Sequence, residues 1–425
     1  MAKIYRPRLL DSIISSKLKA MGAVLIQGPK WCGKTTTGEH HSKSVIFLDD
    51  PDKRFQYEVL GNTQISLLLD GETPRLIDEW ELIPQIWDAV RHTIDRRGEP
   101  GQFILTGSAK PADKSAIYHS GTGRFAWVKM RPMSLFESGD STGQVSLKEL
   151  FDNPGKPIGC LVESDLNRMA YYVCRGGWPL SVDLPPDISI SVAKEYYEAI
   201  VNADIMNVDG ISRNPATART LMRSYARFQG TQTPVSTISE DMQNSDYSVD
   251  QQTVRNYLEA LRNLFVIEDL PAWNPNLKSK TAIRTTETRY FIDPSIACAS
   301  LHIGPGDLIN DLKTFGFIFE TLCVRDLRVY ADVLAGDLYH YRDKNGLECD
   351  CVIHLRDGRY ALVEIKLGGE KLIEEGAKNL QKLKEKINCE KMGLPSFEMV
   401  LTATGGMAYK RKDGIYVVPI NSLRD

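Results

Sequence analysis

The sequence lacks the features that mark secreted, membrane-spanning and zinc-clip proteins. Its eight cysteines are scattered and include no C-x-x-C pair, the spacing typical of a zinc site or a dithiol redox motif. No run of about 18 apolar residues occurs, and the first residues, 1–8, hold no apolar core of signal-peptide length. We therefore expect a cytoplasmic protein in a reducing compartment, with no membrane partner.

The chain also lacks a strong charge of either sign. Its formal net charge is −3, and the sequence pI is near 6.2. This balance excludes a histone-like binder but not a DNA enzyme, which needs only a local basic face. The 42% apolar and 25% charged composition is that of a soluble globular protein. At roughly 100–200 residues per domain, 425 residues predict two to three domains.

The strongest positive signal is a glycine-bounded loop after an apolar strand. Residues 23–26 are apolar, and the spacing from Gly28 to Gly33-Lys34-Thr35 is that of a P-loop. In such a loop, backbone N–H groups surround phosphates, the lysine reaches the terminal phosphoryl oxygens and the hydroxyl binds Mg²⁺. The sequence therefore predicts an ATP site that comprises Gly28, Lys30, Cys32, Gly33, Lys34, Thr35 and Thr36.

Two adjacent carboxylates, Asp78 and Glu79, follow another apolar segment and predict the hydrolytic half of this site. Asp78 would hold Mg²⁺ together with Thr35, and Glu79 would polarise the attacking water as the catalytic base. The alternative is that the acidic pair only caps the helix that follows.

Hydrolysis also needs groups that sense the γ-phosphate and stabilise developing charge. Thr106 ends the apolar segment 103–106 and Ser108 follows it, and we assign Ser108 to the catalytic set; a strand-end cap is the alternative. Arg124 and Arg131 are the candidate arginines, either of which could act in trans from a neighbouring subunit, and Arg124 is our catalytic assignment. An ordinary surface ion pair is the alternative for each.

Together these motifs resemble the AAA-type ATPases of bacteria and archaea that carry a C-terminal domain of unknown function. The segments that carry the resemblance keep the family's order along nearly the whole chain: 28–36, 76–79, 103–109, 123–124, 131–137, 176–179, 253–258 and 291–294. The resemblance implies an ATPase fold and a domain order rather than a pathway. Cys32 departs from the pattern, because a residue such as valine is expected there, and we expect the smaller cysteine to be tolerated.

A second constellation lies in the last third of the chain. Asp350 on one predicted strand, a hairpin turn at 357–358, and Glu364-x-Lys366 on the next strand resemble the core of restriction-endonuclease-like nucleases. Asp350 and Glu364 could share Mg²⁺, Lys366 could orient the attacking water, and Glu320 is a further candidate ligand. The alternative is a half-exposed edge strand without chemistry.

Between these regions, residues 216–270 predict three short helices in a helix-turn-helix bundle. The third helix, 254–265, is a candidate recognition helix for DNA, and a purely structural role is the alternative. Its polar positions are Arg255, Asn256, Glu259, Arg262 and Asn263, and the best supporting basic patch is Lys278, Lys280 and Arg284.

The expected fold class is α/β. Four short apolar segments predict a buried parallel sheet, at 24–26, 45–48, 75–77 and 103–106, with a covering helix at 84–95. We expect an AAA-type P-loop domain over residues 1–190, a winged-helix-like helical domain over 191–300 and a restriction-endonuclease-like domain over 301–425.

The predicted activity is Mg²⁺-dependent ATP hydrolysis, coupled through the C-terminal domain to DNA or to a protein partner. The alternatives are an ATP-dependent nuclease and a regulatory ATPase that binds a protein. The expected cofactors are ATP and Mg²⁺, and an oligomer is compatible with each of these functions.

Overall fold

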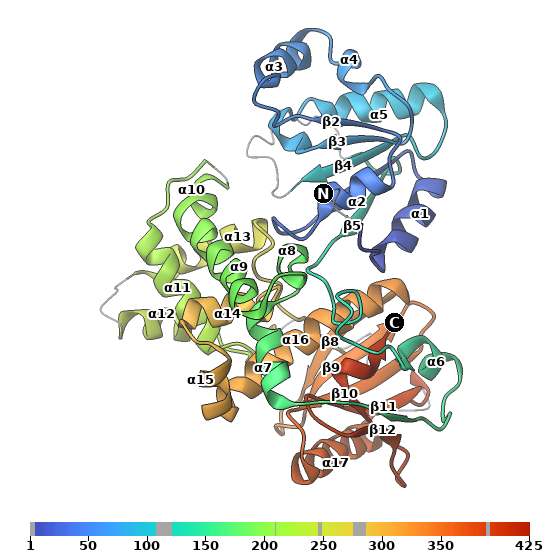
Figure 1. The fold of residues 1–425 in the computed structure, drawn as a ribbon, viewed down its shortest axis with the longest axis vertical. Helices are drawn as coiled ribbons and strands as arrows, with labels where there is room; N and C mark the ends of the chain where they lie inside the picture. Colours follow the sequence, from blue (N-terminus) through green and yellow to red (C-terminus); the bar gives the residue numbers. More distant parts are fainter. Residues whose placement is uncertain (1–4, 108–120, 209, 245–248, 275–285, 388–391) are drawn as a thin grey trace. The chain divides into compact units, whose positions relative to one another are not determined.

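The computed structural model describes residues 5–107, 121–208, 210–244, 249–274, 286–387 and 392–425 (Figure 1). The chain divides into two compact units. The first consists of Met1–Pro132, Val201–Pro215 and Glu259–Val266, and the second of Met133–Ile200, Ala216–Leu258 and Ile267–Asp425. Among the helices of these described ranges, none is both long enough and apolar enough to cross a membrane.

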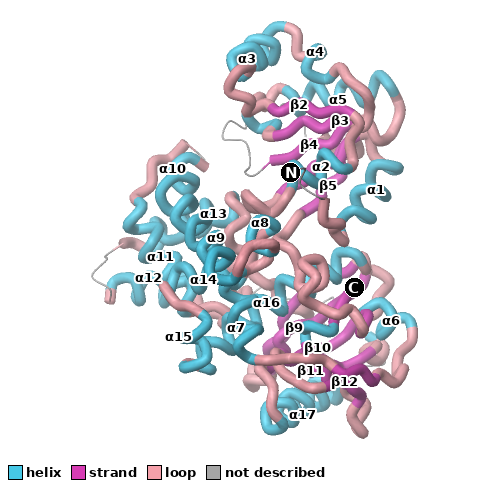
Figure 2. The backbone as a smooth tube through the Cα atoms, viewed as in Figure 1, coloured by secondary structure: helices cyan, strands magenta, loops and turns pink. Residues whose placement is uncertain are grey.

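A parallel five-stranded sheet forms the centre of the first unit (Figure 2), in the order β2-β3-β4-β1-β5. Its strands are β1 (Ala23–Gln27), β2 (Ser44–Phe47), β3 (Arg75–Asp78), β4 (Phe103–Gly107) and β5 (Phe125–Lys129). The four strands expected from sequence are confirmed, and β5 is an addition. Residues of β3 and β4 are buried throughout, which explains why their apolar residues do not alternate with polar ones.

Helices cover both faces of this sheet. Around it lie α1 (Leu10–Ala20), α2 (Lys34–His40), α3 (Arg54–Thr63), α4 (Ser66–Leu69) and α5 (Ile86–Arg97), with the short helix η1 (Trp80–Leu82). The short helix α10 (Ile205–Asn207) also belongs to this compact unit. Trp87 and Val90 of α5 pack with Leu25 and Leu105 in one core cluster. Ile14 of α1 belongs to a second cluster, with sheet residues such as Val24 and Ile26. The alternation of sheet residues between two cores is what a doubly covered parallel sheet requires.

The second unit is built on a mixed seven-stranded sheet, in the order β7-β12-β13-β11-β10-β9-β8. Its strands are β7 (Gly159–Leu161), β8 (Gly336–Arg342), β9 (Glu348–Leu355), β10 (Tyr360–Lys366), β11 (Phe397–Thr402), β12 (Met407–Lys410) and β13 (Tyr416–Pro419). A separate parallel pair joins β6 (Val145–Ser146) to β14 (Leu423–Arg424). Strands β9 and β10 form the expected hairpin, with Tyr360 opposite His354.

The helices of the second unit include two long ones that contact this sheet, α16 (Leu312–Val333) and α17 (Glu370–Lys386). Leu380 and Leu383 of α17 pack against Val352 and Leu362 of the sheet. The others are α6 (Leu147–Asp152), α7 (Leu166–Arg175), α8 (Pro179–Val182), α9 (Pro186–Ala199), α11 (Pro215–Arg227), α12 (Val235–Gln243), α14 (Pro294–Leu301) and α15 (Pro305–Asn310). The helix α13 (Gln251–Asn263) belongs to this unit up to Leu258 and to the first unit from Glu259. The π-helix η3 (Ile200–Asp204) follows α9, and the 3₁₀ helix η5 (Ile420–Ser422) precedes β14.

The three helices expected within 216–270 correspond to α11, α12 and α13. After α13, antiparallel bridges pair Ile267 with Phe291 and Leu270 with Thr288. This order of helices and paired segments is consistent with a winged helix, which stays a prediction. The basic patch Lys278, Lys280 and Arg284 lies outside the described residues.

The compact units differ from the three expected domains. Residue 190 lies within α9 and residue 300 within α14, so both expected boundaries fall inside helices. Strand β7 comes from the range assigned to the ATP-binding domain but pairs with β12 near the C-terminus. Such pairing joins segments far apart in sequence, and local patterns do not reveal it.

Candidate active site

The P-loop lies between β1 and α2, at the carboxyl end of β1, the strand between β4 and β5. Lys34 is the first residue of α2 and is buried, and its Nζ donates to the carbonyl oxygens of Gly28 at 3.0 Å and Pro29 at 2.8 Å. The ammonium group therefore lies inside the curve of the loop. A phosphate held by the loop's backbone N–H groups would meet this positive charge directly.

Two features of the loop's backbone explain its glycines. A Cβ on Gly28 would lie 2.1 Å from the carbonyl oxygen of Met130, so a side chain at this position cannot fit. Gly33 has a φ of 101°, in the left-handed region that glycine adopts without steric cost. Trp31 also has a positive φ, of 63°, and its side chain is largely exposed. Trp31 is thus a non-glycine residue in a strained backbone conformation, in a loop that the chain after β5 approaches closely at Gly28.

The carboxylate of Asp78 is held by two hydroxyl groups. Thr35 Oγ1 donates to Asp78 Oδ1 at 3.0 Å, and the Thr106 hydroxyl donates to the same carboxylate oxygen. The strands bring these residues together, since Thr106 of β4 pairs in register with Ile26 of β1 and with Asp78 of β3. Burial raises the pKa of Asp78, and the hydrogen bonds from Thr106 and Thr35 oppose that shift.

These oxygen atoms fit a magnesium site. Mg²⁺ prefers hard oxygen ligands, and Thr35 and Asp78 supply a hydroxyl and a carboxylate within hydrogen-bonding distance of each other. The sequence predicted Thr35 and Asp78 as the magnesium pair, and the structure places them together. The structure also shows that the Thr106 hydroxyl donates to Asp78, a contact that we did not assign from sequence.

Glu79 follows Asp78 and adopts a left-handed conformation, with φ 53°. It precedes the 3₁₀ helix η1, yet its side chain makes no capping hydrogen bond to that helix. Asp78 is engaged with the two threonines. The capping alternative for the acidic pair therefore finds no support in the geometry, and Glu79 as catalytic base stays a prediction.

The structure places the candidate γ-phosphate sensor Thr106 and the candidate arginine Arg124 in different regions. Thr106 contacts Asp78, whereas Ser108 lies outside the described residues. The carbonyl of Arg124 accepts a hydrogen bond from the amide of Ala23, at the amino end of β1, so Arg124 lies at the sheet edge opposite the P-loop. Its Nε lies 2.8 Å from Asp95, the ion pair that the alternative interpretation expected. The structure does not bring Arg124 and Lys34 of one chain together, and a role in trans stays a prediction.

Arg8 is a support of the P-loop that sequence analysis missed. Its guanidinium donates to the carbonyl oxygens of Cys32 at 2.9 Å and Arg131 at 2.8 Å, which ties the loop to the chain that follows β5. Cys32 is fully buried among apolar residues, and its Sγ lies 3.7 Å from the carbonyl oxygen of Met130. An isolated arginine near the N-terminus carries no motif, so only the fold could assign this contact.

The remaining predicted ATP-site residues lie on the same loop and helix. Thr36 follows Thr35 on α2 and is exposed. The Lys30 ammonium lies 2.6 Å from Asp204 Oδ1 at the end of the π-helix η3 (Ile200–Asp204), within the same compact unit. Lys30 is therefore paired with a carboxylate, and a phosphate would have to compete with that partner.

The second constellation does converge. Lys366 Nζ lies 2.7 Å from Glu364 Oε2 and 3.3 Å from Asp350 Oδ2, and the amide of Ile365 donates to Asp350 at 2.7 Å. Glu320 of α16 accepts a hydrogen bond from the Tyr290 hydroxyl. The edge-strand alternative is wrong, because β10 lies between β9 and β11 and is almost entirely buried.

Burial and mutual charge shift the pKa values of three residues in this acidic cluster. Burial and the charge of Asp350 raise the pKa of Glu364 to about 8. Burial and the same neighbour raise the pKa of Glu320 well above its ordinary value. Burial alone would lower the pKa of Lys366, but the charges of Asp350 and Glu364 raise it. The ammonium group lies where a cation shared by Asp350 and Glu364 would bind, so such a cation would have to displace it.

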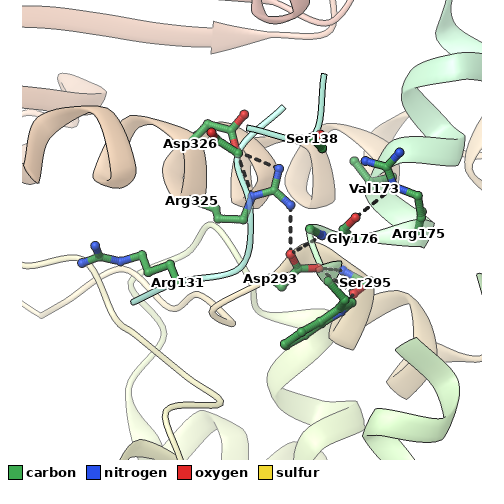
Figure 3. A network of polar contacts seen from close by, with 12 residues as sticks. Arg131, Ser138, Val173, Arg175, Gly176, Asp293, Ser295, Arg325 and Asp326 are labelled. Carbon is green, nitrogen blue, oxygen red and sulfur yellow. Dashed lines mark hydrogen bonds and ion pairs between the residues drawn. The ribbon is translucent and has the colours of Figure 1, made fainter. Parts of the chain in front are cut away.

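A buried network explains three other segments of the family resemblance (Figure 3). The Arg325 guanidinium lies 2.9 Å from Asp293 and 2.7 Å from Asp326. Asp293 accepts the amide of Gly177 at 2.9 Å, and Asp326 accepts the amide of Leu135 at 2.9 Å. Leu135, Gly177 and Asp293, one from each of these segments, thus meet around Arg325 and Asp326 in the second unit. These contacts join segments far apart in sequence, which their sequence pattern did not indicate.

Comparison with known proteins places the nucleotide site within a known domain. Residues 21–138 match an AAA domain, residues 166–307 a domain of unknown function (DUF8612) and residues 315–423 a domain of unknown function (DUF4143). Uncharacterized proteins of Mycobacterium bovis and Mycobacterium tuberculosis are each 24% identical over 81% of this chain and 70% of their own length. The structure of a Walker-type ATPase of Pyrococcus abyssi is 13% identical, with a TM-score of 0.37, and covers 70% of this chain and 96% of its own.

The AAA match spans the P-loop, both carboxylates at the end of β3, Thr106 and Arg124. The residues that form the candidate ATP site in the structure therefore lie within the matched AAA domain, and this match supports ATPase activity. The first compact unit therefore carries an AAA-like P-loop ATPase domain.

Proposed function

We propose that this protein is a Mg²⁺-dependent ATP hydrolase that couples turnover to the handling of DNA or a protein partner through its second unit. The observation that supports hydrolysis best is the carboxylate of Asp78 held between Thr35 and Thr106, beside a P-loop lysine that lies within its loop. Binding alone requires the loop, whereas hydrolysis requires the acidic residues at the end of β3.

Each residue has a distinct role in this mechanism. Lys34 binds the terminal phosphate oxygens, and Thr35 and Asp78 would hold Mg²⁺. When bound, the ion neutralises charge that develops on the phosphates. Glu79 orients the attacking water and accepts its proton at the carboxylate. Thr106 keeps Asp78 oriented toward Thr35.

The test is ATP binding and turnover by the full chain, with and without DNA. Lys34→Ala should abolish tight ATP binding and keep the native circular dichroism spectrum, because it removes a phosphate contact but no core side chain. Glu79→Gln should bind ATP and lose turnover by roughly 10²–10⁴-fold, the contribution of a positioned base. Exposed Lys43→Ala and Glu72→Gln are the matched controls. Unchanged ATP affinity in Lys34→Ala would show that the site assignment is wrong.

DNA and protein partners give different results in these assays. DNA-stimulated turnover supports DNA handling, and its absence across DNA lengths and forms contradicts it. A protein partner should copurify from the native host even after nuclease treatment. Recovery of nucleic acid alone would argue against a protein partner.

A second candidate function is Mg²⁺-dependent cleavage of phosphodiester bonds by the second unit. It is favoured by the convergence of Asp350, Glu364 and Lys366 on the hairpin β9–β10. The charges of these three residues also shift the pKa of Glu320. Asp350 and Glu364 would hold the ion, and Lys366, once displaced from them, would orient the attacking water.

The pKa of Glu364 sets the pH dependence of this second activity. A carboxylate must lose its proton to bind a metal, so Mn²⁺ binding and DNA cleavage should both increase from pH 7 to pH 9, across the Glu364 pKa of about 8. Asp350→Ala and Glu364→Ala should abolish both, and exposed Glu375→Ala should abolish neither. No cleavage by the wild type with any divalent metal at either pH would rule out the nuclease.

A further inference from the structure

Three side chains outside the ATP site converge where α1 begins and α2 ends. Asp11 lies in the first turn of α1, His40 is the last residue of α2 and His41 follows it. One carboxylate oxygen and one imidazole nitrogen from each histidine all lie within 4.8 Å of one another. His41 Nε2 and Asp11 Oδ1 are 2.9 Å apart. Across the described ranges, this is the only such group of His, Cys, Asp or Glu side chains.

The donor set determines which ions the group can bind. Two imidazole nitrogens and one carboxylate suit Zn²⁺, Co²⁺ and neighbouring transition metals, whereas Mg²⁺ and Ca²⁺ prefer all-oxygen ligands. Three protein ligands also leave a position for water, as in open zinc sites. The chemistry therefore separates this group from the Thr35–Asp78 pair, which offers oxygen atoms only.

Neighbouring residues orient two of the three ligands. The Tyr5 hydroxyl donates to Asp11 Oδ1 at 2.6 Å, and the Tyr5 ring stacks on the His40 ring with centroids 4.0 Å apart. The amide of Arg8 donates to the other carboxylate oxygen of Asp11 at 2.8 Å. Such outer contacts orient ligands in protein metal sites. The side chains of Asp11 and His41 keep 20% and 11% exposure, and His40 is exposed, so an ion can reach them.

We propose that Asp11, His40 and His41 bind a divalent transition-metal ion of the Zn²⁺ class. The ion would take the place of the direct contact between His41 and Asp11. It would join the start of α1 to the end of α2, the helix whose first residue is Lys34. The ion would hold the far end of the P-loop helix, and its site is separate from the magnesium site of ATP hydrolysis.

The test uses the full chain without an affinity tag or nucleotide, titrated with Co²⁺ and then with Zn²⁺. One Co²⁺ should bind per chain and give ligand-field absorption without a sulfur-to-cobalt charge-transfer band, and Zn²⁺ should displace it. His40→Ala and His41→Ala should weaken binding by roughly tenfold or more, as the loss of a metal-site contact does. Zn²⁺ should also raise the melting temperature of the wild type but not of these variants.

Controls separate this site from other possible sites. His92→Ala removes an exposed histidine of α5 and should bind Co²⁺ like the wild type. Asp78→Asn should also keep the Co²⁺ spectrum, because its carboxylate is not a ligand here. His41→Gln keeps a side chain that can donate to Asp11, so loss of Co²⁺ in this variant reports a lost ligand rather than a lost fold. The proposal fails if Co²⁺ does not bind, or if it binds the wild type and both histidine variants equally.

Discussion

At the scale of single residues, hydroxyl groups decide how the acidic residues of the ATP site are held. Asp78 is buried, and burial raises its pKa, while the hydrogen bonds from Thr106 and Thr35 oppose that shift. Thr106 is itself buried. Its hydroxyl therefore acts through Asp78, as a positioning group.

Thr106→Val tests this role, because valine keeps the shape of threonine and removes only the hydroxyl. We expect ATP affinity without Mg²⁺ to stay unchanged and Mg²⁺-dependent turnover to fall roughly tenfold, a typical loss for a group that orients a metal ligand. Thr63→Val, on the exposed face of α3, is the matched control. Equal turnover in the wild type and Thr106→Val, measured at limiting Mg²⁺, would contradict the assignment.

His340 gives the second unit a pH-dependent stability. It is buried, its Nδ1 lies 3.0 Å from Gln232 Nε2, and burial lowers its pKa from 6.5 to about 4. The folded state thus favours neutral His340, and the stability that this contributes is complete above pH 6.5 and is lost as the pH falls through 4. Acidification over this range should lower the free energy of unfolding by up to about 3 kcal/mol.

Urea unfolding of the wild type and His340→Gln at pH 7 and pH 4.5 measures this effect. The variant should be less stable than the wild type at pH 7 and should lose less stability on acidification, because it has no titrating group. Exposed His92→Gln should keep the wild-type dependence. An identical pH dependence in all three proteins would assign the acid sensitivity to other groups.

At the scale of elements, the P-loop depends on the segment that follows β5. That segment approaches Gly28 closely, and Arg8 bonds to both Cys32 and Arg131. Strand β5 was not among the expected strands, although it pairs with β1 along the whole length of that strand. The loop's shape is therefore a property of two neighbouring strands as well as of its glycines.

Gly28→Ala should damage folding as well as ATP binding. Its Cβ would lie 2.1 Å from a backbone carbonyl oxygen, which cannot move aside as a flexible side chain can. We expect a loss of about 1–3 kcal/mol in unfolding free energy, the usual cost of overpacking, together with loss of ATP binding. Gly316→Ala in α16 has no atom within 4 Å of the added carbon and is the control. Calorimetry and ATP titration measure both effects, and a Gly28→Ala protein of wild-type stability would contradict the close approach.

At the scale of the whole molecule, the two compact units have separate cores and separate polar sites. The ATP site belongs to the first unit, and the Arg325 network and the acidic cluster belong to the second. Units with their own cores can unfold separately. Ligand binding to one should then stabilise that one alone.

Scanning calorimetry with a non-hydrolysable ATP analogue and Mg²⁺ tests this independence. We expect two transitions, of which the analogue raises only the one that belongs to the first unit. The stabilisation should be about 2.7 kcal/mol when the free analogue is at about 100 times its Kd. Lys34→Ala should show both transitions and no shift. If the analogue raises both transitions equally, the two units unfold as one.

Local sequence patterns were sufficient to predict the elements whose structure depends on neighbouring residues. The P-loop, the strands β1 to β4 and the hairpin β9–β10 were all predicted, because each depends on neighbouring residues and their spacing. The pairing of Thr35 with Asp78 was also predicted, since carboxyl ends of parallel strands meet at one sheet edge. Arg8, Thr106 as a support of Asp78 and the Arg325 network were missed, because their contacts join residues that no short pattern links.

The sequence by itself therefore determined which residues form the candidate ATP site of the first unit: a loop of P-loop spacing and a carboxylate pair at the end of β3. Only the tertiary structure decided where Arg124 lies, that Lys366 occupies the space between Asp350 and Glu364, and that Asp11 meets His40 and His41. The physical reason is the range of the contacts. A loop is specified by the backbone preferences of adjacent residues, whereas the charge around a buried group depends on every element that packs against it.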